Sequence, residues 1–162
     1  DFYNGDEITK IVNRSSGILG VEIDQLGAEQ IASRSRGTPR IANRLLRRAR
    51  DYCEVKADGR INAGLVNDAM DLMEVDVNGF DYLDRKFLAA IIEKFNGGPV
   101  GIDAIASAIG EERGTVEDLI EPFLIQGGFL IRTPRGRMAS GKAYEHFGMK
   151  PPKEIIQQEN LL

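Results

Sequence analysis

A chain of 162 residues and 17.9 kDa can form one ordinary domain or two small ones. Its 42% hydrophobic and 28% charged residues exclude disordered, fibrous and low-complexity proteins, because this composition can bury a core. A net charge of −4 and a pI of about 5.1 exclude a protein that coats nucleic acid over its whole surface. Any contact with nucleic acid therefore depends on local basic patches.

Few residues could form a targeting signal or a metal centre. The chain starts Asp1-Phe2-Tyr3-Asn4 without an initiator methionine, and no apolar run approaches the roughly 20 residues of a membrane span. We expect no signal peptide, and a functional unit larger than this chain. The only cysteine, Cys53, excludes an internal disulfide and is typical of a reducing compartment. The only histidine, His146, excludes a multi-histidine metal site, and we expect it at the surface or in packing.

Positive charge is concentrated in two segments. Residues 34–50 contain seven arginines and no acidic residue. Residues 122–144 also lack acidic residues, and their basic side chains lie among four glycines: Arg132, Arg135, Arg137 and Lys142. Both segments are candidates for binding an anionic partner.

The first half of the chain has the apolar periodicity of amphipathic helices. The predicted helices cover residues 8–19, 25–37 and 39–53, with capping or terminating residues Gly20, Asp24, Gly37 and Thr38, and a fourth helix follows Asn62 and extends to residue 73. Their apolar stripes, which include Ile18 and Leu26, are expected to form the core of a small four-helix bundle.

A polar, glycine-containing stretch at residues 73–79 predicts a domain boundary. Two helices are predicted at 83–95 and 102–109, and a third opens with a capping box of Thr115 and Asp118 and buries Leu119. A strand at 129–133, a hairpin tip at 135–137 and a second strand at 138–140 follow. Three helices followed by a β-hairpin is the order of a winged-helix domain.

Residues 136–143 nearly match the phosphate-binding P-loop pattern, G-x-x-x-x-G-K-[ST]. Ala143 replaces the hydroxyl residue that would bind magnesium, and too few residues follow it for the further sheet that a P-loop requires. We therefore expect a glycine-rich hairpin here instead of an ATP site.

The hairpin arginines Arg132, Arg135 and Arg137 suit contacts with DNA phosphates, which position a protein without reading bases. The helix that would enter the major groove in such a domain is acidic, since it carries Glu117, Asp118 and Glu121. We therefore expect the hairpin to make the DNA contact, with little sequence preference. Charge alone leaves the alternative that these arginines only increase solubility.

Arg40 places a cation directly after Pro39 in the first turn of a predicted helix, where the helix dipole favours anions. A bound phosphate would remove this conflict, so the helix N-terminus and the guanidinium together predict an anion site suited to a nucleotide. The alternative is an exposed arginine screened by solvent. Arg44, Arg47 and Arg48 continue the basic face, and we assign most of them to solvent or to contacts with another subunit.

Four segments resemble the RuvB family of bacterial AAA+ motors, which drive Holliday-junction branch migration. They are residues 37–50 (GTPRIANRLLRRAR), 79–86 (GFDYLDRK), 97–101 (GGPVG) and 132–138 (RTPRGRM). The similarity extends in register from Phe2 to about Pro152. It implies a mainly α fold in which residues 4–74 form the four-helix AAA+ lid and residues 77–162 the winged-helix head with its short β-hairpin, without the large ATPase domain.

The resemblance also implies roles for particular residues. The arginine of the Gly-Thr-Pro-Arg motif, Arg40, would sense the nucleotide's phosphates, and Tyr3 would line the adenine site with Pro39 nearby. The hairpin arginines Arg132 and Arg137 would contact DNA, with Arg135 between them. ATP or ADP would be the cofactor, with Mg²⁺ held by the large domain. Because this chain has no Walker motif, we expect no ATPase activity from it alone.

The partners implied are duplex DNA or a Holliday junction, RuvA bound through a segment outside this chain, and RuvC in the resolving complex. The resemblance further implies a homo-hexameric ring in the full-length protein and a cytoplasmic role in recombination, DNA repair and the SOS response. One alternative is a non-enzymatic winged-helix DNA-binding regulator with a helical oligomerisation domain, which would require sequence-specific binding. Another is a protein-interaction module without DNA contact.

Overall fold

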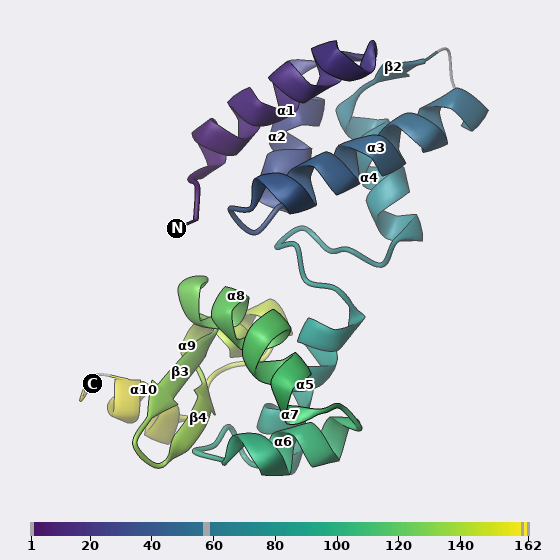
Figure 1. Cartoon of the computed structure of the whole chain (residues 1–162). Helices are drawn as coiled ribbons and strands as arrows, with labels where there is room; N and C mark the ends of the chain where they lie inside the picture. The colour runs from purple at the N-terminus through teal and green to yellow at the C-terminus, as the bar shows by residue number, and fades with distance from the viewer. Residues whose placement is uncertain (1, 57–58, 160, 162) are drawn as a thin grey trace. The chain divides into compact units, whose positions relative to one another are not determined.

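The computed structural model describes residues 2–56, 59–159 and 161. It is mainly helical with a small antiparallel sheet, which confirms the predicted fold class. The chain divides into two compact units, Asp1–Tyr82 and Leu83–Leu162, which we call the N-terminal unit and the C-terminal unit (Figure 1). Each unit is described by itself.

The helices described in the N-terminal unit are α1 (Gly5–Leu19), α2 (Gln25–Ser33), α3 (Pro39–Lys56) and α4 (Ala63–Leu72). The side chain of Asp24, a predicted cap, accepts a hydrogen bond from the Gly27 N–H, and Asn62 caps α4 by accepting from the Leu65 N–H. Helix α1 contacts α2 and α3, and α4 packs against the same two helices (Figure 1). A short parallel pair, β1 (Glu22–Ile23) and β2 (Arg60–Ile61), joins the loops.

The apolar core of this unit departs from the predicted stripes at two positions. Ile18 is 77% exposed and Leu26 is 63% exposed, so the prediction that they point inward is wrong. Ile18 lies two residues after the buried Ser16 in α1, and Leu26 lies two residues before the buried Ala28 in α2. Two residues correspond to about 200° around a helix, which directs both side chains to solvent.

Helix α2 ends at Ser33, four residues before the predicted end at Gly37. Arg36 and Gly37 both have left-handed backbone, with φ of 56° and 63°, and such residues cannot continue a right-handed helix. The loop from Arg34 to Thr38, which we call the α2–α3 loop, therefore makes a tight turn into α3.

Helix α5 (Tyr82–Lys94) is followed by α6 (Ile102–Ile109). Helix α6 ends before Gly110, whose backbone is left-handed. The next helical segment is continuous but changes type, from α7 (Arg113–Thr115) through the π-helical η1 (Val116–Ile120) to α8 (Glu121–Gln126).

Two predictions for this segment are wrong. Thr115 is inside the helix, because Glu112 is the last extended residue before it, so no capping box opens at Thr115. Leu119 is 67% exposed because the wider π-turn shifts the buried face. The π-turn ends at Ile120, two residues before Pro122, which has no N–H for a regular helical hydrogen bond.

The hairpin consists of β3 (Leu130–Thr133) and β4 (Gly136–Ala139), paired antiparallel. Its tip is Pro134–Arg135, not the predicted 135–137, because Thr133 pairs with Gly136 and places Gly136 in the strand. Val100 pairs with Arg137 through two backbone hydrogen bonds of 2.8 and 2.9 Å and so adds a third extended segment. Helices α9 (Gly141–His146) and α10 (Lys153–Glu159) follow the hairpin (Figure 1).

Candidate functional site

The first turn of α3 presents a cation and free backbone donors together. Pro39 is the first helical residue and Arg40 the second, and the first turn holds no acidic residue. The first N–H groups of a helix have no partner within the helix. Arg40 is exposed and makes no side-chain hydrogen bond or ion pair within residues 2–56 and 59–159. This end of α3 can therefore accept an anion.

Tyr3 lies against the loop that leads into this helix. Its backbone N–H donates to the Gly37 carbonyl at 2.8 Å, and its side chain is 47% exposed. A Cβ added at Gly37 would lie 2.7 Å from the Tyr3 carbonyl oxygen, so the close approach requires glycine there. The fold thus brings Tyr3 to the segment that holds Pro39 and Arg40.

The hairpin places its three arginines in different environments. Arg132 and Arg137 are directly opposite each other on β3 and β4, and their side chains are 59% and 14% exposed. Arg135 is at the exposed tip and makes no side-chain hydrogen bond or ion pair within the part of the chain that the structure describes. The Thr133 hydroxyl stabilises the tip, because it accepts from the Arg135 N–H and donates to the Gly136 carbonyl.

Glu121 neutralises part of this charge, and the sequence analysis did not assign it that role. Its carboxylate accepts from Arg137 Nε at 2.5 Å and Nη2 at 3.2 Å, and from Arg132 Nη2 at 3.3 Å. Opposed arginines on neighbouring strands repel each other, so a shared carboxylate stabilises the hairpin. Glu117 lies 4.0 Å from Arg137 but is also paired with Arg113, so the three guanidinium groups of the hairpin keep a net positive charge.

Glu121 does not contribute to an exposed acidic face of this helix, since its side chain is 2% exposed and already paired. Glu117 is half-buried and bonds to Arg113, whereas Asp118 is exposed. The acidic face of this helix is thus smaller than its sequence indicates. No spacing signal in the sequence distinguishes Glu121 from its neighbours, because the pair forms across fifteen intervening residues.

The residues that nearly match a P-loop have structural partners. Lys142 Nζ donates to the Gly127 carbonyl at 2.7 Å and lies 4.4 Å from the centre of the Phe129 ring. Ser140 caps α9 and donates to the Gly128 carbonyl at 2.6 Å. These contacts connect the segment to the turn before β3. His146 packs edge-on against Phe129, so of the two expected placements, at the surface or in packing, the structure shows packing.

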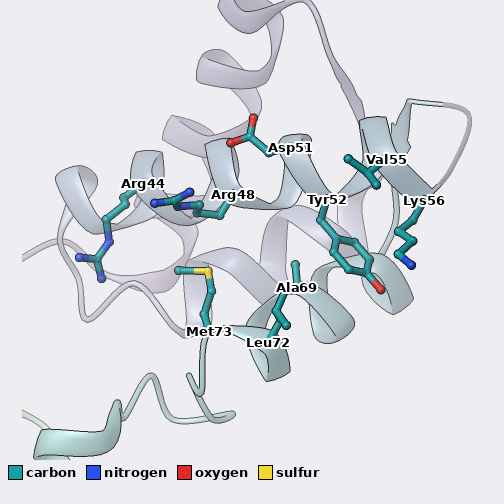
Figure 2. A pocket seen from close by; sticks show the side chains of 9 residues that line it. All are labelled: Arg44, Arg48, Asp51, Tyr52, Val55, Lys56, Ala69, Leu72 and Met73. Carbon is teal, nitrogen blue, oxygen red and sulfur yellow. The ribbon is translucent and has the colours of Figure 1, made fainter.

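A groove of about 690 Å³ lies between α3 and α4 of the N-terminal unit (Figure 2). Two exposed apolar side chains border it, Val55 at 80% and Leu72 at 76%. The remaining lining residues are Arg44, Arg48, Asp51, Tyr52, Lys56, Ala69 and Met73. Arg44 and Arg48 lie one and two turns beyond Arg40, so the groove continues the basic face of α3.

Two kinds of feature are absent from the described ranges 2–56, 59–159 and 161. No group of three histidine, cysteine or carboxylate side chains is placed to hold a metal ion. None of the helices there has the length and apolarity needed to cross a membrane.

Two family models match the chain and together cover most of it. Residues 3–76 match the RuvB AAA lid domain, and residues 77–148 match the RuvB C-terminal winged helix domain. A mutant form of Thermotoga maritima RuvB is 47% identical with a TM-score of 0.90. The T. maritima RuvB Holliday junction branch migration motor is 48% identical with a TM-score of 0.89.

These similarities extend over nearly all of this chain and about half of each relative. The alignments cover 94% of this chain and 51% of either T. maritima structure. The chain therefore spans about half the length of the RuvB structures that it matches.

Proposed function

The chain belongs to the RuvB family, and from this premise we propose that it is the C-terminal part of an ATP-dependent DNA motor that drives Holliday-junction branch migration. The observation that carries the proposal is the hairpin, which keeps a net positive charge and holds at its tip Arg135, a guanidinium without a side-chain partner in the described part of the chain. Family membership favours this motor over a sequence-specific regulator or a protein-interaction module.

The N-terminal unit would serve as the lid that senses nucleotide. Arg40 fits this role because its guanidinium is exposed without an ionic partner among the described residues, beside the free donors of α3. Tyr3 would line the adenine site, with Pro39 nearby. ATP supplies the phosphoanhydride whose hydrolysis drives the motor, with Mg²⁺ held by a large ATPase domain. This chain alone would bind phosphate oxygens without hydrolysing ATP.

The C-terminal unit would contact duplex DNA through the hairpin. Arg135 and Arg132 project exposed guanidinium groups that can bind phosphate oxygens. Arg137 is held by Glu121, so a direct contact of Arg137 with DNA would require exchange of that carboxylate for a phosphate. Phosphate contacts carry little sequence information, which suits a motor that moves along DNA of any sequence.

We also propose that the full-length protein forms a homo-hexameric ring in which a neighbouring subunit covers the groove between α3 and α4. The exposed Val55 and Leu72 at its border support this assignment (Figure 2). Sedimentation of the full-length protein tests it. Leu72→Glu should reduce ring formation, whereas Ile18→Glu, an exposed control on α1, should leave it unchanged.

Family membership also supports a proposal about the cellular process and the partners of the motor. We propose that the motor works in the cytoplasm, in recombination, DNA repair and the SOS response. Its partners would be RuvA, bound through a segment outside this chain, and RuvC during resolution of the junction.

Fluorescence anisotropy of a labelled Holliday junction and of unrelated duplexes tests the DNA contact. Binding should be insensitive to sequence, should weaken with salt, and should fall in the Arg132→Ala/Arg135→Ala variant. Arg14→Ala, an exposed arginine of α1, is the matched control. Sequence-selective binding that survives the double variant would instead support the regulator.

A further inference from the structure

The segment that follows the N-terminal bundle, residues 76–81, is bound to the α2–α3 loop; we call it the linker. Arg36 Nε donates to the Gly79 carbonyl at 2.9 Å. Arg36 Nη2 also lies 3.3 Å from Asp81 Oδ2. The Arg36 side chain is 13% exposed, whereas its ionic partner Asp81 is 45% exposed, so the guanidinium is largely shielded from water and the carboxylate is not.

The backbones of the linker and the loop are also in direct contact. Gly79 has left-handed backbone with φ of 77°, and a Cβ added there would lie 2.6 Å from the Arg34 carbonyl oxygen. This approach is closer than any side-chain-bearing residue permits. Glycine at position 79 is therefore required for the linker to lie on the loop.

The linker has an ordered internal structure. Asp76 Oδ1 accepts hydrogen bonds from the N–H groups of Asn78 at 2.9 Å and Phe80 at 3.0 Å. The Gly79 N–H donates to the Asp76 carbonyl at 2.9 Å, and Phe80 is fully buried. These bonds define the conformation in which the Gly79 carbonyl accepts from Arg36. The linker leads directly into Tyr82, the first residue of α5.

The same loop also leads into the candidate nucleotide site. The Gly37 carbonyl accepts from the Tyr3 N–H, and the Thr38 carbonyl accepts from the Ala42 N–H at the start of α3. Arg36 itself has left-handed backbone, which is unfavourable for a residue with a side chain. With this backbone the Arg36 side chain reaches Gly79 and Asp81 of the linker.

We propose that Arg36 is a positioning residue that makes the winged-helix unit follow the lid when the nucleotide at Arg40 changes. It acts by holding the linker on the α2–α3 loop. This inference rests on the proposed function, because it assumes that Arg40 senses nucleotide and that the C-terminal unit contacts DNA.

Hydrogen exchange on this chain tests the attachment itself. Asparagine tolerates left-handed backbone, so Arg36→Asn removes the side-chain contacts while it keeps the turn. Without Arg36 the linker should leave the loop more often, and the turn whose amides bond to Asp76 should then open. Exchange at the amides of Asn78, Gly79 and Phe80 should therefore rise roughly tenfold, the effect of a lost charge-assisted hydrogen bond. Protection of the α4 core amides should not change, and Arg14→Asn should match the wild type.

Coupling is then measured in the full-length motor, as base pairs of Holliday junction migrated per ATP hydrolysed. Arg36→Asn should lower this ratio several-fold while basal ATP hydrolysis and DNA affinity are retained. Arg36→Lys keeps the cation and should restore most of the ratio. Gly79→Ala should reproduce the loss with Arg36 intact, because the added Cβ displaces the linker.

The outcomes separate the two levels of the argument. A wild-type protein that hydrolyses ATP without moving junctions would remove the proposed function. A wild-type protein that migrates junctions, with Arg36→Asn and Gly79→Ala variants that expose the linker amides but keep the ratio, would overturn the role of Arg36. If Arg36→Asn also increases exchange at the α4 core amides, the ratio of base pairs migrated per ATP measured for Gly79→Ala decides whether holding the linker matters for coupling.

Discussion

Arg137 and Glu121 form a bidentate ion pair that fixes the hairpin to the helix beneath it. Arg137 Nε and Nη2 donate to separate carboxylate oxygens at 2.5 and 3.2 Å. Arg137 comes from β4 and Glu121 from the first turn of α8, and their side chains are 14% and 2% exposed. A pair with this burial costs much to break, because either partner left alone is a poorly solvated charge.

Glu121→Gln should therefore destabilise the C-terminal unit by about 2 kcal/mol, because two opposed arginines lose their shared carboxylate. The measurement is denaturant-dependent hydrogen exchange of amides in β3 and β4. Glu117→Gln, at a half-buried carboxylate 4.0 Å from Arg137, should cost well under half as much. Equal effects of the two substitutions would show that burial of Glu121 does not determine the energy.

The hairpin arginines should separate into one that binds DNA and one that maintains structure. Arg135→Ala should reduce the slope of log K against log salt by about one and leave the unfolding free energy unchanged, because its guanidinium has no partner among the described residues. Arg137→Ala, in contrast, should lower the unfolding free energy of the C-terminal unit, because it leaves Glu121 without its bidentate partner. Salt titrations by anisotropy, combined with hydrogen exchange, distinguish the two. A stable Arg137→Ala variant that alone loses DNA binding would reverse these assignments.

Arg40→Ala should have opposite effects on stability and on nucleotide response. Removing a cation from the first turn of α3 should stabilise the N-terminal unit by about 0.5 kcal/mol, since the helix dipole favours anions there. In the full-length protein the same variant should lose the stimulation of motor activity by ATP. Thermal unfolding and ATP titration measure the two effects. Loss of stability would mean that Arg40 has a structural partner instead.

The sequence predicts local structure well where a single residue determines it. Asp24 caps one helix and Gly20 ends another as expected, because each acts on the nearest backbone groups. The winged-helix order was equally readable from apolar periodicity. Local patterns therefore determine the elements and the fold class of this chain.

The contacts that determine the candidate sites are long-range, and periodicity carries no signal for them. Glu121 meets Arg137 across fifteen intervening residues, and Arg36 meets Gly79 across forty-two. The π-turn before Pro122 also changes which side chains are buried, and so exposes Leu119. Arg40 and Arg135 could be proposed from charge and helix position, whereas the partners of Arg137 required the fold.

Tyr144 gives the C-terminal unit a dependence on alkaline pH. Burial raises the pKa of its hydroxyl above the ordinary tyrosine value of about 10. The unfolded chain therefore ionises first as pH rises, so the stabilisation is complete below about pH 10 and is lost as pH approaches the folded-state pKa. Tyr144→Phe should flatten this decline, measured by urea unfolding across the alkaline range, and Tyr82→Phe, at an exposed tyrosine, should retain it. An unchanged decline in Tyr144→Phe would assign the alkaline loss of stability to other groups, since phenylalanine has no proton to lose.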